Sequence, residues 1–120
     1  MPIIFLQNST EQPWHEQVNA VPLAIVYKHS PTCELSAQAM EEVKVLSRER
    51  DDVPIFPVDV LLQRSLSNEI ESRLHIRHES PQAIIMQRGQ PVWNGSHRQV
   101  TLKRLSEALP DAATLYAAGS

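Results

Sequence analysis

The chain has 120 residues, of which 42% are hydrophobic and 21% charged, with a formal net charge of −3 at pH 7 and a single cysteine. This length suits one domain with its own hydrophobic core. The slight negative charge argues against a protein that binds nucleic acid or an anionic membrane, and one cysteine excludes an internal disulfide. Because no stretch approaches the roughly 20 apolar residues that span a bilayer, and no cationic signal peptide opens the chain, we expect a soluble cytoplasmic protein.

The first predicted elements are a strand and a helix. Residues 2–7 form a short apolar run typical of a strand. A helix is expected after it, with Ser9 or Thr10 as its N-cap and with Trp14 and Val18 on one face.

Strands and helices then alternate. The nearly continuous apolar run at 22–28 predicts a central strand covered on both faces. Helical spacing of apolar side chains follows from residue 33 to about residue 50. A second buried strand is predicted over 53–60, and a helix over 65–76.

The last third of the predicted domain contains a hairpin and a helix. Strands are expected at 82–87 and 91–95, joined by a tight turn around Gly89. The final helix is expected over 101–109, with Thr101 as its N-cap.

The order β-α-β-α-β-α-β-β-α predicts an α/β fold with a mixed central sheet and helices on both faces. Strands joined through helices are expected to be parallel neighbours with right-handed crossovers, and only the closing hairpin is expected to be antiparallel. We interpret residues 1–110 as a single domain and residues 111–120 as a loosely ordered tail.

Cys33 lies where reactive groups in such folds belong, between the carboxyl end of a predicted strand and the next helix. The free N–H groups and partial positive charge of a first helical turn favour thiolate over thiol. Ser36 shares the helix face with Cys33, and its hydroxyl can donate to the sulfur but cannot attack a mixed disulfide. The exposed charge expected at Glu34 repels a thiolate, but water screens it. The alternative is an inert, buried Cys33.

Pro81 is the next candidate site residue, and it lies directly before the strand predicted at 82–87. Most bonds before proline are trans, but the predicted topology together with Cys33 favours a cis bond here, as in thioredoxin-like folds. A cis turn would leave the backbone of Ser80 open to pair with an extended partner segment.

Segments 28–42 and 58–97, with their H-S-P-T-C-E-L-S and R-H-E-S-P-Q motifs, resemble the monothiol bacilliredoxins of the YtxJ type. The resemblance runs over residues 22–105. It implies a thioredoxin-like fold and a monothiol thiol–disulfide oxidoreductase that removes a small thiol, bacillithiol, from mixed disulfides on proteins. Cys33 would be the attacking thiol. The family usually has proline where this chain has Glu34.

The other predicted site residues lie near Cys33 and Pro81 in the sequence. Ser36 joins Cys33 as a catalytic candidate, and the predicted substrate-binding residues are Thr32, Arg77, Ser80 and Pro81. The carboxylates of bacillithiol would be held by Arg77, with Lys28 and Arg88 as further candidates. His78 and Glu79 are interpreted as solvated loop residues.

No tightly bound cofactor and no metal are expected, since the five histidines lack the spacing of a metal site. Bacillithiol is expected as co-substrate. The expected partners are S-thiolated cytosolic proteins and a small thiol or disulfide reductase for regeneration. The alternative function is a non-enzymatic thioredoxin-fold binding module or a thiol redox sensor, and a third possibility is a structural Cys33 in a degenerate fold.

Overall fold

The computed structural model describes residues 3, 13–32 and 34–110 of the chain. Of the strand predicted over 2–7 it describes Ile3 alone, which forms a parallel bridge with Ile55. Cys33 and the predicted tail at 111–120 lie outside the described residues.

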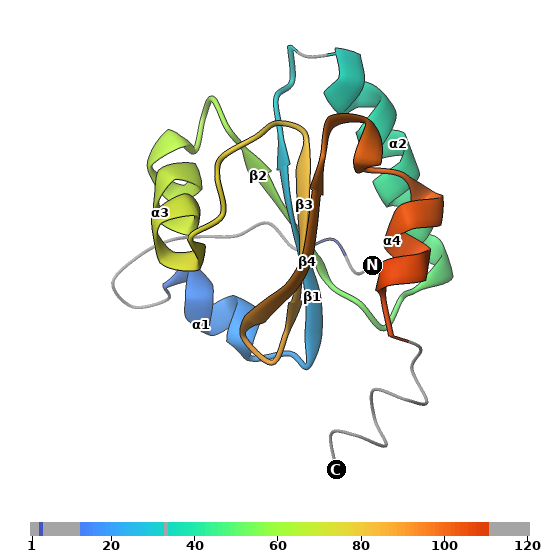
Figure 1. The fold of residues 1–120 in the computed structure, drawn as a ribbon, viewed down its shortest axis with the longest axis horizontal. Helices are drawn as coiled ribbons and strands as arrows, with labels where there is room; N and C mark the ends of the chain where they lie inside the picture. Colours follow the sequence, from blue (N-terminus) through green and yellow to red (C-terminus); the bar gives the residue numbers. More distant parts are fainter. Residues whose placement is uncertain (1–2, 4–12, 33, 111–120) are drawn as a thin grey trace.

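The described elements alternate as the sequence predicts (Figure 1). They are α1 (Trp14–Asn19), β1 (Leu23–His29), α2 (Glu34–Glu49), β2 (Ile55–Asp59), α3 (Arg64–Leu74), β3 (Gln82–Gln87), β4 (Gln90–Ser96), the 3₁₀ turn η1 (His97–Gln99) and α4 (Leu102–Ala108).

Two predicted helix starts have different outcomes. Thr101 caps α4 as predicted, because its Oγ1 accepts a hydrogen bond from the Arg104 amide at 3.1 Å. The cap predicted at Ser9 or Thr10, which are not described, is wrong for α1, because this helix begins only at Trp14. Pro13 takes the N-cap position, and its carbonyl accepts the first helical hydrogen bond.

The four strands form one mixed sheet in the order β2-β1-β3-β4. β1 is parallel to β2, and β3 is antiparallel to both β1 and β4. The prediction that only the closing hairpin would be antiparallel is therefore wrong. After α3, residues 75–81 run back along the sheet to the carboxyl end of β1, so β3 starts there (Figure 1). These residues can span about 23 Å when extended, enough to pass a six-residue strand of roughly 20 Å.

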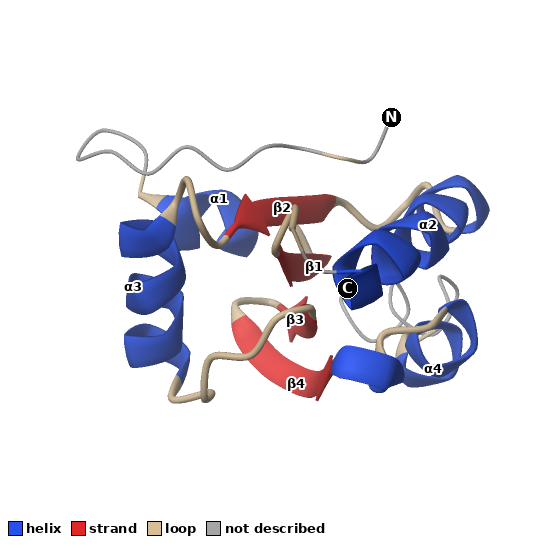
Figure 2. Ribbon diagram, turned by 90° about the horizontal axis from the view of Figure 1, so that it is seen from above, coloured by secondary structure: helices blue, strands red, loops and turns tan. Residues whose placement is uncertain are grey.

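Helices cover both faces of the sheet, as predicted. α1 and α3 lie on one side, and α2 and α4 on the other (Figure 2). Alternate side chains of each strand point to opposite faces, so Ile25 and Ile85 pack in the core under α2, whereas Val26 and Ile84 pack in the core under α3.

The turn between β3 and β4 confirms the hairpin predicted around Gly89. Arg88 and Gly89 both have positive φ, 51° and 83°. Two such residues give the backbone twist that a two-residue hairpin requires, and glycine adopts it without strain. A Cβ at Gly89 would also lie only 2.5 Å from the Asn19 side chain.

Candidate functional site

The candidate site lies at the edge of the sheet where β1 and β2 end and β3 begins. Register places Lys28 of β1 beside Gln82 of β3, and His29 beside Asp59 of β2. The chain therefore enters α2 and returns into β3 at the same edge, at the top of Figure 1. This antiparallel arrangement brings Thr32 and Pro81 to one end of the molecule.

Ser36 forms hydrogen bonds that fix the start of α2. It is buried, and its Oγ accepts a hydrogen bond from the Ser30 amide at 3.1 Å. The Tyr27 hydroxyl donates to the Ser36 carbonyl at 3.1 Å. Thr32 is exposed, and its hydroxyl pairs with that of Ser30 at 3.2 Å. Among the described residues, Ser36 Oγ only accepts a hydrogen bond, so the Ser36 hydroxyl proton is available for a further acceptor.

The Ser80–Pro81 peptide bond is cis, and Pro81 is buried. The Pro81 carbonyl accepts a hydrogen bond from the His97 amide at 2.8 Å. Within the described part of the chain, the Ser80 backbone has no hydrogen-bond partner, and its buried Oγ has none either. Buried polar groups are normally satisfied, so Ser80 stands out among the described residues.

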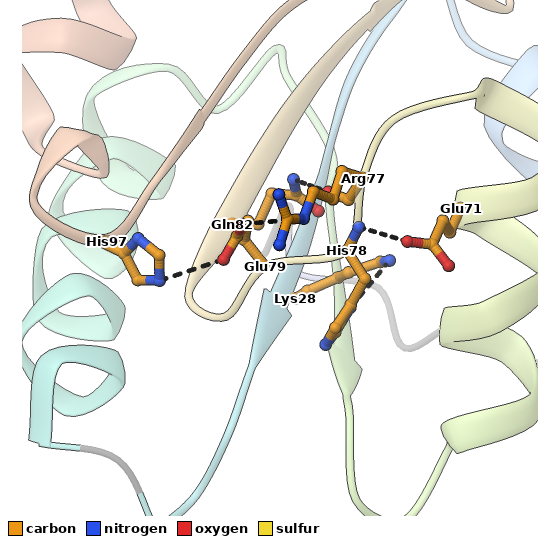
Figure 3. A network of polar contacts seen from close by, with 7 residues as sticks. All are labelled: Lys28, Glu71, Arg77, His78, Glu79, Gln82 and His97. Atoms are coloured by element: carbon orange, nitrogen blue, oxygen red, sulfur yellow. Dashed lines mark hydrogen bonds and ion pairs between the residues drawn. The ribbon is translucent and has the colours of Figure 1, made fainter.

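Polar side chains lie between this edge and an open groove. Glu79 lies between two basic side chains, with Arg77 Nε at 3.8 Å and His97 Nε2 at 3.4 Å (Figure 3). His97 lines a groove of about 810 Å³ between α2 and η1, together with Glu34 and Arg98. The volume lies within the usual range for small-molecule sites.

The structure distinguishes between the three cations predicted to hold a carboxylate. Arg77 is available, because 90% of its side chain is exposed. Lys28 is wrong as a surface ligand, since it is fully buried beneath α3. Arg88 is also wrong, because it lies in the hairpin turn at the opposite end of β3 from Pro81.

Comparison with known proteins then identifies the family. The family model for the monothiol bacilliredoxin BrxC matches residues 6–105. The chain belongs to this family. A thioredoxin-fold protein named as a candidate oxidoreductase is 30% identical, with a TM-score of 0.80 over 88% of this chain and 92% of that chain. This bacilliredoxin-family chain therefore has a thioredoxin fold and belongs to a thiol redox family.

More distant structures share the fold alone. Oxidised thioredoxin from Plasmodium falciparum is 17% identical, with a TM-score of 0.68 over 88% of this chain and 95% of that chain. Thioredoxin f2 from Chlamydomonas reinhardtii is 19% identical, with a TM-score of 0.67 over 88% and 91% of the two chains.

Two general features of the bacilliredoxin-family chain can be stated for its described residues. None of the described helices is long and apolar enough to cross a membrane. Nor do three histidine, cysteine, aspartate or glutamate side chains gather as a metal site requires, within residues 3, 13–32 and 34–110.

A buried polar network beneath the site was not predicted from the sequence. Lys28 Nζ donates to the Ser67 carbonyl at 3.0 Å and lies 3.3 Å from His78 Nδ1. The His78 amide donates to Glu71 Oε2 at 2.6 Å (Figure 3). The interpretation of His78 as a solvated loop residue is therefore wrong, because its ring is half-buried between β1 and α3. The available signal was Lys28, a charged residue within an apolar strand.

Burial lowers the pKa of both groups in this network. Desolvation is the main cause for Lys28, and the Glu71 carboxylate partly offsets it. The pKa of His78 is lowered first by burial and then by the charges of Lys28 and Arg64, whereas the carboxylates of Glu71 and Glu79 oppose this shift. His78 is thus favoured in its neutral form, with Nδ1 free to accept from Lys28.

We expect the His78 ring to make folding stability depend on pH. Below about pH 6.5 the unfolded chain binds a proton at His78 that the folded protein does not, so the unfolding free energy falls as pH falls towards the folded pKa. Urea unfolding at pH 7.5 and 5.5 measures this loss. The control is His78→Gln, which should lose less stability between these two pH values. An equal loss in both proteins would contradict the lowered pKa.

Proposed function

We propose that the protein is a monothiol thiol–disulfide oxidoreductase that removes bacillithiol from mixed disulfides on cytosolic proteins through Cys33. The observation that carries this proposal is the position of Glu34, the first residue of α2, which directly follows Cys33 in the sequence. Helix α2 begins at the same edge of the sheet as Ser80 and Pro81, in a chain of the monothiol bacilliredoxin family. We place the reaction in the cytosol, where unreacted thiols stay reduced.

The proposed first step is a thiol–disulfide exchange. The Cys33 thiolate attacks the bacillithiol sulfur of the mixed disulfide. A new S–S bond forms between Cys33 and bacillithiol, the old S–S bond breaks, and the substrate cysteine leaves as a thiolate that takes up a proton.

Release requires a second thiol, since Ser36 cannot attack a disulfide. A bacillithiol thiolate attacks the bacillithiol sulfur of the adduct, which frees the Cys33 thiolate and forms bacillithiol disulfide. A disulfide reductase then supplies the two electrons that return bacillithiol disulfide to the thiol.

The described residues support the thiolate that this chemistry needs. Cys33 directly precedes Glu34, the first residue of the 16-residue helix α2, whose free N–H groups favour a negative charge. Glu34 is exposed, so water screens its repulsion of the thiolate. The Ser36 hydroxyl proton can stabilise the sulfur as a donor.

Substrate binding is proposed at two adjacent places. The open backbone of Ser80 would pair with an extended segment of the thiolated protein, by β-augmentation. The bacillithiol carboxylates would meet Arg77 and His97, which lie on either side of Glu79. Of these residues, His97 lines the groove.

Turnover distinguishes this enzyme from a binding module or a redox sensor. A bacillithiolated model protein, in large excess over the enzyme and with bacillithiol and a reductase present, should be cleared over many cycles. Intact mass should show the bacillithiol adduct on Cys33 when the second thiol is omitted. Cys33→Ser should lose at least about 10³-fold in rate, because a serine hydroxyl is a poor nucleophile at neutral pH. One stoichiometric transfer without turnover would instead support a sensor.

A further inference from the structure

The segment before Pro81 is held by side chains rather than by a backbone ladder. Within the described residues, no backbone–backbone hydrogen bond involves residues 76–80. A segment without such a ladder must be fixed by other groups if it is to keep one conformation. The position of this segment matters because Ser80 is its last residue.

Two side chains hold the backbone of this segment through hydrogen bonds. Gln82 Nε2 donates to the Arg77 carbonyl at 2.9 Å, and Glu71 Oε2 accepts from the His78 amide at 2.6 Å. Each fixes the backbone of one residue. Neither fixes the His78 side chain, which reaches inward towards β1 (Figure 3).

Lys28 supplies the remaining contact, which we name the Lys28 tie. The tie consists of the Nζ contacts with the Ser67 carbonyl of α3 and with His78 Nδ1. It joins the end of β1, helix α3 and the segment before Pro81. Ser67 Oγ lies 3.3 Å from the same His78 nitrogen, so the ring is held from two sides.

An aliphatic residue would be the ordinary occupant of this strand position. Lys28 is fully buried on the same face of β1 as Ala24 and Val26, in an apolar core. Lysine is almost never fully buried unless it is paired, and an apolar residue of similar volume is often at least as stable. Stability alone therefore does not explain this lysine, whereas its contact with His78 does.

We propose that Lys28 is a positioning residue that, through His78, fixes the segment before Pro81 and thereby the binding of an extended polypeptide carrying the mixed disulfide. This inference rests on the proposed function and deepens it. The Lys28 tie acts on the binding of the protein substrate and not on the reactivity of the thiol. A small disulfide that makes no contact along Ser80 should not depend on it.

Lys28→Met tests the proposal, with Lys44→Met as the matched control on the exposed face of α2. KM for a bacillithiolated peptide should rise about tenfold in Lys28→Met, the size of one lost hydrogen bond to a charged group, with kcat within about twofold. The rate of Cys33 with the small disulfide 5,5′-dithiobis(2-nitrobenzoate) should stay within about twofold. Lys44→Met should match the unsubstituted protein in all three. An unchanged KM, or an equal loss with both disulfides, would overturn the proposal.

A second variant keeps the proposal testable if Lys28→Met does not fold. His78→Leu removes the acceptor from the other end of the Lys28 tie, outside the sheet, and should raise KM by a similar factor. The double variant should be no worse than the worse single variant, because both changes remove one interaction.

Amide hydrogen exchange tests the Lys28 tie without any substrate. Exchange at the His78 amide, which donates to Glu71, should be about tenfold faster in Lys28→Met than in the unsubstituted protein and in Lys44→Met. If the unsubstituted protein shows no turnover, the proposed function fails, and exchange still decides whether the Lys28 tie exists. Unchanged exchange would overturn the tie itself.

Discussion

Ser36→Cys should convert the monothiol chemistry into a self-resolving one. The new thiol would stand three residues after Cys33, on the same face of the first turn of α2. Once Cys33 carries bacillithiol, the thiolate introduced at position 36 attacks the Cys33 sulfur, an internal disulfide forms and bacillithiol leaves as a free thiol. Intact mass should show the adduct in the unsubstituted protein, and in the variant a mass about 2 Da below that of its reduced form, from the two lost hydrogens.

The reductant that regenerates the enzyme should also change with this substitution. A dithiol reductant, rather than a second bacillithiol, should now sustain turnover. Ser36→Ala is the control, because it removes the hydroxyl without adding a thiol. It should keep the adduct and lose about 1 kcal/mol of unfolding free energy with the bond from the Ser30 amide. A persistent adduct on Ser36→Cys would show that the side chain at position 36 cannot reach the Cys33 sulfur.

Ile25→Ala should produce the largest loss of stability. Ile25 is fully buried in the central strand, between Ile55 of β2 and Ile85 of β3. Truncation removes apolar contacts and leaves a cavity, which costs about 2–5 kcal/mol. Domains of this kind are stable by only about 5–15 kcal/mol in total, so urea unfolding should show a much lower midpoint with a similar slope.

Val92→Ala is the matched control for the core substitution. Val92 lies on the edge strand β4 and is 52% exposed. Its truncation should change the unfolding free energy by no more than about 0.5 kcal/mol. Equal losses at Ile25 and Val92 would contradict the assignment of Ile25 to the core.

Local patterns in the sequence predicted most of the elements. Apolar spacing located α2, α3 and α4, since each buries one face against the sheet. The run at 22–28 predicted β1, because a central strand is buried on both faces. The start of α1 was predicted wrongly, because two good capping residues precede a proline that occupies the cap itself.

The direction of β3 could not be predicted in the same way. Helical spacing ends at Leu74, and the polar residues after it do not indicate how far the chain travels before the next strand. The structure shows that this segment passes the whole length of the sheet. That return brings Ser80 and Pro81 to the edge where α2 begins.

The candidate site could likewise be predicted only in part from the sequence. Cys33, Ser36 and Pro81 could be identified by residue type and local position. The contact between Lys28 and His78 could not, because the two residues are 50 positions apart and only the packing of α3 against β1 joins them.

The positions of most strands and helices, the family, and the single thiol of the proposed chemistry could be inferred without a structure, because they depend on local periodicity and on residue type. The direction of β3, the exposure of Arg77 and the burial of Lys28 could be known only from the folded chain. Those outcomes depend on contacts between distant segments, and the free energy of burying a charge such as Lys28 is set by the groups that packing places around it.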